Sequence, residues 1–157
     1  MDNYAELLAT LTQQEQDLQF VTFNSDTALA LGLAIVESAR RQQLAVTVQV
    51  ARNGQVLFQH AMDGATADQA EWIRRKNNVV QRFGRSSYFV GVSAKSRGEV
   101  FEDNKHLDTR DYAAHGGAFP ILVKDVGIVG TVTVSGLPQA QDHALVVAAL
   151  HAHLHGI

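Results

Sequence analysis

The sequence predicts an α+β fold, in which one antiparallel sheet is covered by helices. Two hairpin signals and the helical segments around them carry this prediction. Asn53-Gly54 stands between two β-rich runs and is the strongest short hairpin signal. A second pair of apolar runs flanks Lys124-Asp125. Because hairpins join antiparallel strands, we expect antiparallel pairing within each pair.

The chain begins with two helical segments. Residues 3–17 are expected to form a polar helix with a leucine stripe, followed by an extended link at 18–23. Asn24-Ser25-Asp26 supplies residue types that cap helix N-termini, and apolar residues recur at helical spacing after it. We therefore predict a second helix over about 26–43.

The remaining elements follow from the same rules. Asp63-Gly64 ends the first hairpin, Ser86-Ser87 caps a helix, and the charged residues 99–115 form the longest loop. In chain order we predict strands at 45–50 and 56–60, helices at 67–83 and after 87, strands at 121–123 and 128–134, and a last helix at about 139–154.

Length and composition indicate a single globular domain. The 157 residues carry a formal net charge of −3, which gives no bulk attraction to nucleic acid or anionic membrane. The chain has no cysteine, which excludes disulfides, thiol catalysis and thiolate metal sites. No apolar run is long enough to span a bilayer, and the N-terminus indicates no signal peptide. We expect a cytoplasmic protein without nucleic-acid or membrane partners.

Glycines and a charged helix start mark the candidate site. Gly116-Gly117 leads into the apolar run Ala118–Ile121, and the pair allows main chain to pass close to a ligand or a neighbouring strand. Ser135-Gly136 and Pro138 punctuate the exit of the next strand into a helix, which carries Asp142-His143 on its first turn. These segments have a pattern that is typical of the walls of a small pocket, but they do not indicate which reaction, if any, takes place there.

The segments Gly116–Ile121, Asp125–Gly130 and Val132–His143 resemble the haem-degrading domain family, also called GlcG/HbpS-like. The runs Trp72–Lys76 and Arg82–Ser87 further resemble one uncharacterised branch of it. The resemblance covers nearly the whole chain. It implies a profilin-like fold, with an N-terminal helical extension at residues 1–24 and the GlcG/HbpS-like domain at residues 25–157. It also implies haem as a cofactor to be tested, because the family takes its name from haem-binding members.

A basic run lies on and just after the predicted helix over 67–83. It consists of Arg74, Arg75, Lys76, Arg82 and Arg85. One interpretation is a solvated helix face that pairs with Glu71 or Asp68. The other is an anion site for a small acidic molecule, because the planar fork of arginine binds carboxylate or phosphate.

An axial haem ligand would have to come from histidine, methionine, tyrosine or an oxygen group, because the chain has no cysteine. His115 precedes the glycine pair at the mouth of the predicted pocket, as either a plain loop residue or a ligand contact. In a chain without cysteine, it is also the most reachable axial ligand. His151 and His155 are spaced i, i+4 on the last helix, but a helix C-terminus favours histidine without any metal. We therefore predict no metal site.

Other features also keep two interpretations. Asp142 either interacts with the helix dipole or contacts Arg75 or a bound molecule. The segment Asp108–Tyr112 either covers a site or is plain surface. Four aromatic residues are expected in the core or a subunit interface rather than around a cofactor: Trp72, Phe83, Tyr88 and Phe89.

No nucleophile elbow, P-loop, dinucleotide fingerprint or carboxylate pair indicates catalysis, so whether the protein is an enzyme stays open. The sequence predicts an oligomeric small-ligand-binding protein, with haem binding or degradation and a protein-interaction scaffold as alternatives. A homo-oligomer is expected because an apolar N-terminal segment precedes a domain that closes without it. The expected ligand is a small anion, and the expected site residues are Arg75, Lys76, His115, Gly116, Gly117 and Asp142.

Overall fold

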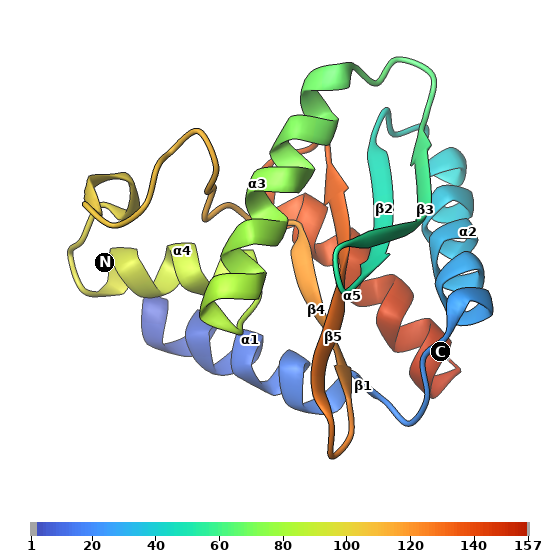
Figure 1. Ribbon diagram of the computed structural model, residues 1–157, viewed down its shortest axis with the longest axis horizontal. Helices are drawn as coiled ribbons and strands as arrows, with labels where there is room; N and C mark the ends of the chain where they lie inside the picture. Colours follow the sequence, from blue (N-terminus) through green and yellow to red (C-terminus); the bar gives the residue numbers. More distant parts are fainter. Residues whose placement is uncertain (1–2, 157) are drawn as a thin grey trace.

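A five-stranded mixed sheet with the strand order β1-β4-β5-β2-β3 forms the centre of the structure (Figure 1). This computed structural model describes residues 3–156. The strands are β1 (Gln19–Phe20), β2 (Thr47–Arg52), β3 (Gln55–Ala61), β4 (Ala118–Val123) and β5 (Gly127–Ser135). Both predicted hairpins are confirmed, since β2 pairs with β3 and β4 with β5 in antiparallel fashion. The sheet is not wholly antiparallel, however, because the predicted link at 18–23 contains β1, which runs parallel to β4.

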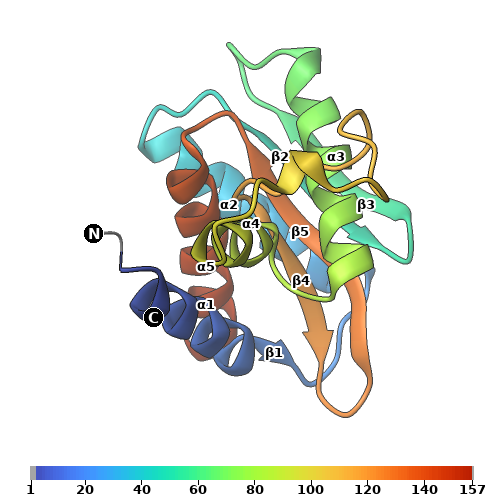
Figure 2. The same ribbon diagram turned by 90° about the vertical axis from the view of Figure 1, so that its left-hand side faces the viewer.

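Helices cover both faces of this sheet and confirm the predicted α+β class. They are α1 (Tyr4–Asp17), α2 (Ser25–Arg41), α3 (Ala67–Phe83), α4 (Ser87–Ser96) and α5 (Gln139–His155), with a short 3-10 turn, η1 (Phe101–Asp103). Helices α2 and α5 pack on one face and α3 on the other (Figures 1 and 2). Helices α1 and α4 pack against each other. Among residues 3–156 no helix is long and apolar enough to cross a membrane.

Local signals set several helix boundaries. The Asn24 side chain accepts from the Thr27 amide, and Thr27 Oγ1 accepts from the Asn24 amide, which completes a capping box at the start of α2. Ser86 Oγ accepts from the Phe89 amide and caps α4 as predicted. Gly84 ends α3 in the left-handed conformation, at a φ of 72°. These caps explain why the predicted and observed helices agree closely.

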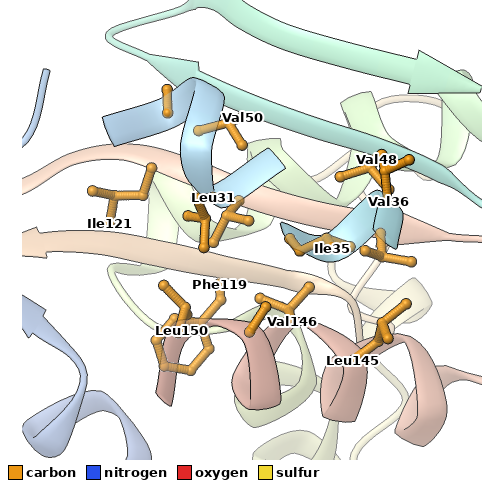
Figure 3. Packing of buried hydrophobic residues seen from close by; sticks show 14 of the residues in the cluster. Leu31, Ile35, Val36, Val48, Val50, Phe119, Ile121, Leu145, Val146 and Leu150 are labelled. Atoms are coloured by element: carbon orange, nitrogen blue, oxygen red, sulfur yellow. The ribbon is translucent and has the colours of Figure 1, made fainter. Parts of the chain in front are cut away.

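The main hydrophobic core lies between the sheet and the α2–α5 layer (Figure 3). Alternate residues of β2, such as Val48 and Val50, point into it and meet Leu31 and Ile35 of α2. Helix α5 closes the other side with Val146 and Leu150, which are both fully buried. This face therefore carries most of the fold's apolar stabilisation.

The opposite sheet face is polar where α3 covers it. The buried polar residues of this face and of α3 are Thr47, Thr131, Thr133, Ser135, Lys76 and Asn77. Thr133 Oγ1 donates to Asn77 Oδ1 over 2.5 Å, and Asn77 Nδ2 donates to Gln49 Oε1 over 2.8 Å. Helix α3 thus rests on hydrogen bonds as well as on apolar contact, and one end of this polar layer opens into the candidate site.

The N-terminal segment packs on its own chain. Leu11, Leu18 and Phe20 are almost fully buried, and Phe20 lies in the main core. The Arg85 Nε donates to Glu15 Oε1 of α1 over 2.9 Å, which ties this helix to the domain. The expectation that the domain closes without this apolar segment is therefore wrong. Homo-oligomerisation itself remains a prediction that needs another surface.

Candidate functional site

The candidate site is a pocket of about 330 Å³ at the N-terminal turns of α3 and α5, beside the end of β5. Three groups of residues line it. Helix α3 with its N-cap contributes Thr66, Asp68, Gln69, Trp72 and Lys76, the β5 exit contributes Ser135, Gly136 and Leu137, and His115, Gln139 and Asp142 complete the wall. Of the predicted site residues, the structure brings Lys76, His115 and Asp142 to this pocket.

A buried ion pair forms part of the pocket wall. Lys76 and Asp142 are only 3% and 1% exposed, and Lys76 Nζ lies 3.1 Å from Asp142 Oδ2. Lys76 Nζ also donates to the Val134 carbonyl over 3.2 Å, and Asp142 Oδ1 accepts from the Leu137 amide over 3.0 Å. Moving two charges out of water costs more free energy than a surface ion pair contributes to stability. Such a pair on a pocket wall therefore points to a binding role.

One N–H group of Lys76 is left over. An ammonium has three donors. The residues that the structure describes provide two hydrogen-bond acceptors for this one, the Val134 carbonyl and Asp142 Oδ2. Because Lys76 lines the pocket, the third donor is the group that a ligand would meet.

Burial sets the protonation behaviour of this pair. Desolvation lowers the pKa of the Lys76 ammonium, while the charge and hydrogen bond of Asp142 act in the opposite direction. Desolvation likewise raises the pKa of the Asp142 carboxyl, against the effect of Lys76. Each charged form thus depends on the other, and a bound anion would stabilise the ammonium further.

The glycine pair makes room for the pocket wall. Gly117 has a φ of 138°, and a Cβ placed on it would lie 2.7 Å from Lys76 Nζ and would collide with the Val134 carbonyl oxygen. A Cβ on Gly116 would collide with the Gln139 carbonyl oxygen. The predicted close approach of main chain is therefore seen, and what approaches is the Lys76 ammonium and the neighbouring backbone.

His115 lies on the pocket wall. Its ring meets Trp72 edge-on, with the centroids 5.5 Å apart, and its Nε2 is 3.8 Å from Glu102 Oε1. Burial lowers the pKa of this histidine, and the nearby Lys76, Lys95 and Arg75 charges lower it as well, against the opposing effect of Glu102. A neutral imidazole at this position can donate to or accept from a ligand.

Two helix N-termini meet at the pocket without side-chain caps. Thr66 and Pro138 occupy the N-cap positions of α3 and α5, and neither caps its helix through a side chain. The first amide groups of a helix have no intrahelical partner and carry the positive end of the dipole. This arrangement favours negative charge between the two helices.

The rest of the basic run lies elsewhere. Arg75 is not on the pocket wall: its guanidinium stacks on Trp72 at 4.5 Å, and its Nε donates to the Thr109 carbonyl over 3.0 Å. Arg74 pairs with Glu71 at 2.8 Å, as expected of a solvated helix face. That interpretation is wrong for Lys76, which points into the protein. Asp142 contacts Lys76 and not Arg75.

The long loop is fastened to α3 rather than free. The Arg74 Nη2 donates to the Arg110 carbonyl and the Asn78 Nδ2 to the Asp111 carbonyl, both over 2.8 Å. The Ala113 amide donates to the Arg75 carbonyl. Residues 109–113 therefore run beside α3, and the loop leads into His115 on the pocket wall.

A larger hollow of about 640 Å³, lined by both apolar and charged residues, lies beside α4 between the end of α3 and residues 97–104. Phe83, Phe89 and Phe101 line it, together with Val90 and Val100. Phe83 is 40% exposed, so it does not lie in the core. A core position is therefore wrong for Phe83, and an interface position for it stays a prediction. Trp72 likewise belongs to the smaller pocket.

The 640 Å³ hollow and His115 do not together form a haem site. An axial ligand must lie inside a hollow that can take the ring. The larger hollow has no histidine, methionine or tyrosine among its described lining residues. His115 lies instead between the 330 Å³ pocket and a hollow of about 150 Å³. Within residues 3–156 no cluster of three metal-ligating side chains occurs either.

Sequence reasoning missed the polar layer that leads to the pocket. Gln69 is its link, since Gln69 Oε1 accepts from Thr47 Oγ1 and Gln69 Nε2 donates to the Ala45 carbonyl. A signal was present in the strict alternation Thr131-Val132-Thr133-Val134-Ser135. Alternation means that one sheet face is polar, and here that face is covered.

Comparison with known proteins confirms the resemblance seen in the sequence. The family described as "Haem degrading protein HbpS-like" matches residues 23–151. A UPF0303 protein of Streptomyces coelicolor is 49% identical over 146 residues, which is 93% of this chain and 92% of that protein. A UPF0303 protein of Serratia proteamaculans is 44% identical over 155 residues, 99% of this chain and 96% of that protein.

Solved structures share the fold. The chain is similar to the Ybr137w protein, with a TM-score of 0.84 and 30% identity over 92% of this chain and 86% of that one. It is also similar to HbpS, with a TM-score of 0.66 and 21% identity over 87% and 92% of the two chains. A PduOC:heme complex gives 0.69 and 20% over 87% and 96%. At these lower identities the likeness concerns the fold alone.

Proposed function

Because this chain belongs to the HbpS-like family, whose fold frames a pocket here, we propose that it is a small-ligand-binding protein. The pocket lined by Lys76, Asp142 and His115 is the binding site, and Gly117 lies against Lys76 beside it. Its ligand is small and carries a carboxylate or a similar anionic group. The protein works as a homo-oligomer that presents one such pocket on each chain.

The buried Lys76–Asp142 pair on an open pocket wall carries this proposal. A ligand carboxylate takes the third N–H of Lys76 and the free amide groups at the start of α5. A hydrogen bond to a charged group contributes about 1.5–3 kcal/mol, enough for about ten- to hundredfold in affinity. The volume of about 330 Å³ at the lower end of the ligand-pocket range limits the ligand to a small molecule.

A titration of wild type and two variants with small carboxylates and inorganic phosphate tests the proposal. The double variant Lys76→Met/Asp142→Asn removes the pair together, so no buried charge is left alone, and it should lose the stabilisation that a carboxylate gives the wild type. Arg75→Gln is the matched control, because Arg75 is a cation on the same helix outside the pocket wall. A carboxylate that stabilises all three proteins equally would refute the site.

A further inference from the structure

One charge on the pocket wall is unsuited to a simple anion. Asp68 lies in the first turn of α3 and lines the pocket, but no hydrogen bond or ion pair joins it to the residues that the structure describes. The formal charges on the wall are Lys76, Asp142 and Asp68. Because Lys76 and Asp142 neutralise each other, Asp68 leaves a net negative charge that opposes an anion.

Asp68 and Lys76 stand at opposite ends of one helix face. The pocket-lining positions 68, 69, 72 and 76 follow helical spacing along α3. Eight residues of helix separate the two Cα atoms by about 12 Å along the axis. A ligand that reaches from the Lys76 ammonium toward the start of α3 therefore approaches the Asp68 carboxylate.

We propose that the ligand of this pocket is a small ω-amino acid, with its carboxylate on Lys76 and its ammonium on Asp68. This inference rests on the proposed function, because it assigns the second end of the same ligand. The ligand ammonium supplies the counter-charge for Asp68 and so offsets the repulsion between Asp68 and a ligand carboxylate. The pocket then holds two cationic groups, Lys76 and the ligand ammonium, among three carboxylates, Asp68, Asp142 and that of the ligand.

The separation of the two charges sets the ligand's length. The rise of about 12 Å joins the two Cα atoms, and both residues line the pocket at their ends of this helix face. The ligand therefore needs two charged groups that lie several bonds apart, one for each end of the face. An α-amino acid, with one carbon between its charged groups, is too short, whereas a chain of three or four methylenes spans the gap.

Trp72 lies between the two charged ends and suits the methylene chain. It lines the pocket between positions 68 and 76, and Arg75 already covers its ring on one side. An apolar middle flanked by two charged ends therefore matches the order acid, aromatic ring and base along α3. A dicarboxylate would place its second anion beside Asp68 and is disfavoured.

Calorimetric titrations with 4-aminobutyrate, butyrate and butylamine test the proposal on wild type, Asp68→Asn and Asp26→Asn. Asp26 is the matched control, because it is a first-turn acid on α2, away from the pocket. We expect wild type and Asp26→Asn to bind 4-aminobutyrate at least tenfold more tightly than butyrate. Asp68→Asn should reduce this advantage to less than threefold and leave butyrate binding equal or stronger.

The outcomes separate the two proposals. If butyrate binds the wild type and 4-aminobutyrate binds no better, the ω-amino acid is refuted while the carboxylate site stands. An advantage that persists in Asp68→Asn also refutes the assignment of the ammonium. If neither compound binds, the ω-amino acid is refuted, and the separate titration with other small carboxylates and inorganic phosphate decides whether the anion site also fails. Urea unfolding of Asp68→Asn confirms that the exposed substitution leaves the fold intact, and glycine, which is too short, should bind no better than acetate.

Discussion

Replacement of Lys76 by methionine should destabilise the protein strongly, because it leaves a buried acid alone. Asp142 is 1% exposed, and Lys76 is its sole ion-pair partner among residues 3–156. Breaking a buried pair by removing one partner costs about 3–5 kcal/mol. For a chain of this size each kcal/mol lowers Tm by about 2–4 °C, so Lys76→Met should melt about 6–20 °C below wild type.

The pH dependence of stability shows whether the unpaired Asp142 carboxylate causes the loss in Lys76→Met. Burial already raises the pKa of Asp142, and without Lys76 the pKa rises further above its unfolded value. A group with a raised folded pKa stabilises the fold below its unfolded pKa and loses that contribution as pH rises through the folded pKa. The deficit of Lys76→Met relative to wild type should therefore be larger at pH 8 than at pH 5.

The double variant Lys76→Met/Asp142→Asn should recover most of this loss. In wild type, Asp142 Oδ1 accepts a hydrogen bond from the Leu137 amide, and the side-chain oxygen of asparagine can accept the same bond. Replacing both ions of a buried pair is often neutral for stability. Urea unfolding of wild type, the single and the double variant measures the difference. A single variant within about 1 kcal/mol of wild type at pH 8, or a double variant as unstable as the single, would refute the reasoning.

Three further predictions concern stability and assembly. Gly117→Val should lose more than about 1 kcal/mol and should lower Tm more than Gly127→Ala, because a Cβ on Gly117 collides with backbone whereas open space surrounds Gly127. Equal melting temperatures would contradict this. Burial lowers the pKa of His143 to about 4, so stability should rise between pH 4 and 6.5 by as much as about 3 kcal/mol. His143→Gln should flatten that dependence in urea titrations, and an unchanged slope would refute the assignment. Light scattering at micromolar concentration should give a multiple of the 17.1 kDa chain mass. The reason is that a single chain leaves Leu29 and Leu33 of α2 half-exposed and the edge of β3 unpaired. A monomer mass would contradict the oligomer.

Much of the fold follows from local signals in the sequence. Asn24 and Ser86 cap helices where predicted, and Asn53-Gly54 makes the expected hairpin. The strand β1 escaped prediction because it has two residues and pairs with β4, about a hundred positions away, through contacts that no local pattern encodes. Because Phe20 of β1 is buried in the core, the N-terminal segment packs on its own chain and not on a neighbouring chain.

The candidate site was predicted in part. Gly117, His115 and Asp142 were chosen for turn chemistry and helix position, and the structure brings them to one place. Lys76 was grouped with the arginines beside it, although neighbouring helical residues point about 100° apart. Its spacing of three residues from Ile73 placed it on the buried stripe, but sequence alone does not show which acid receives it.

Crystals soaked in 3-bromopropionate test the central claim most directly, because bromine marks the position of a small carboxylate by its anomalous signal. We predict one strong bromine peak on each chain inside the 330 Å³ pocket, with the carboxylate within 3.2 Å of Lys76 Nζ. Crystals of the Lys76→Met/Asp142→Asn variant should show no such peak. Bromine found at exposed arginines alone, or in both crystals equally, would contradict the account.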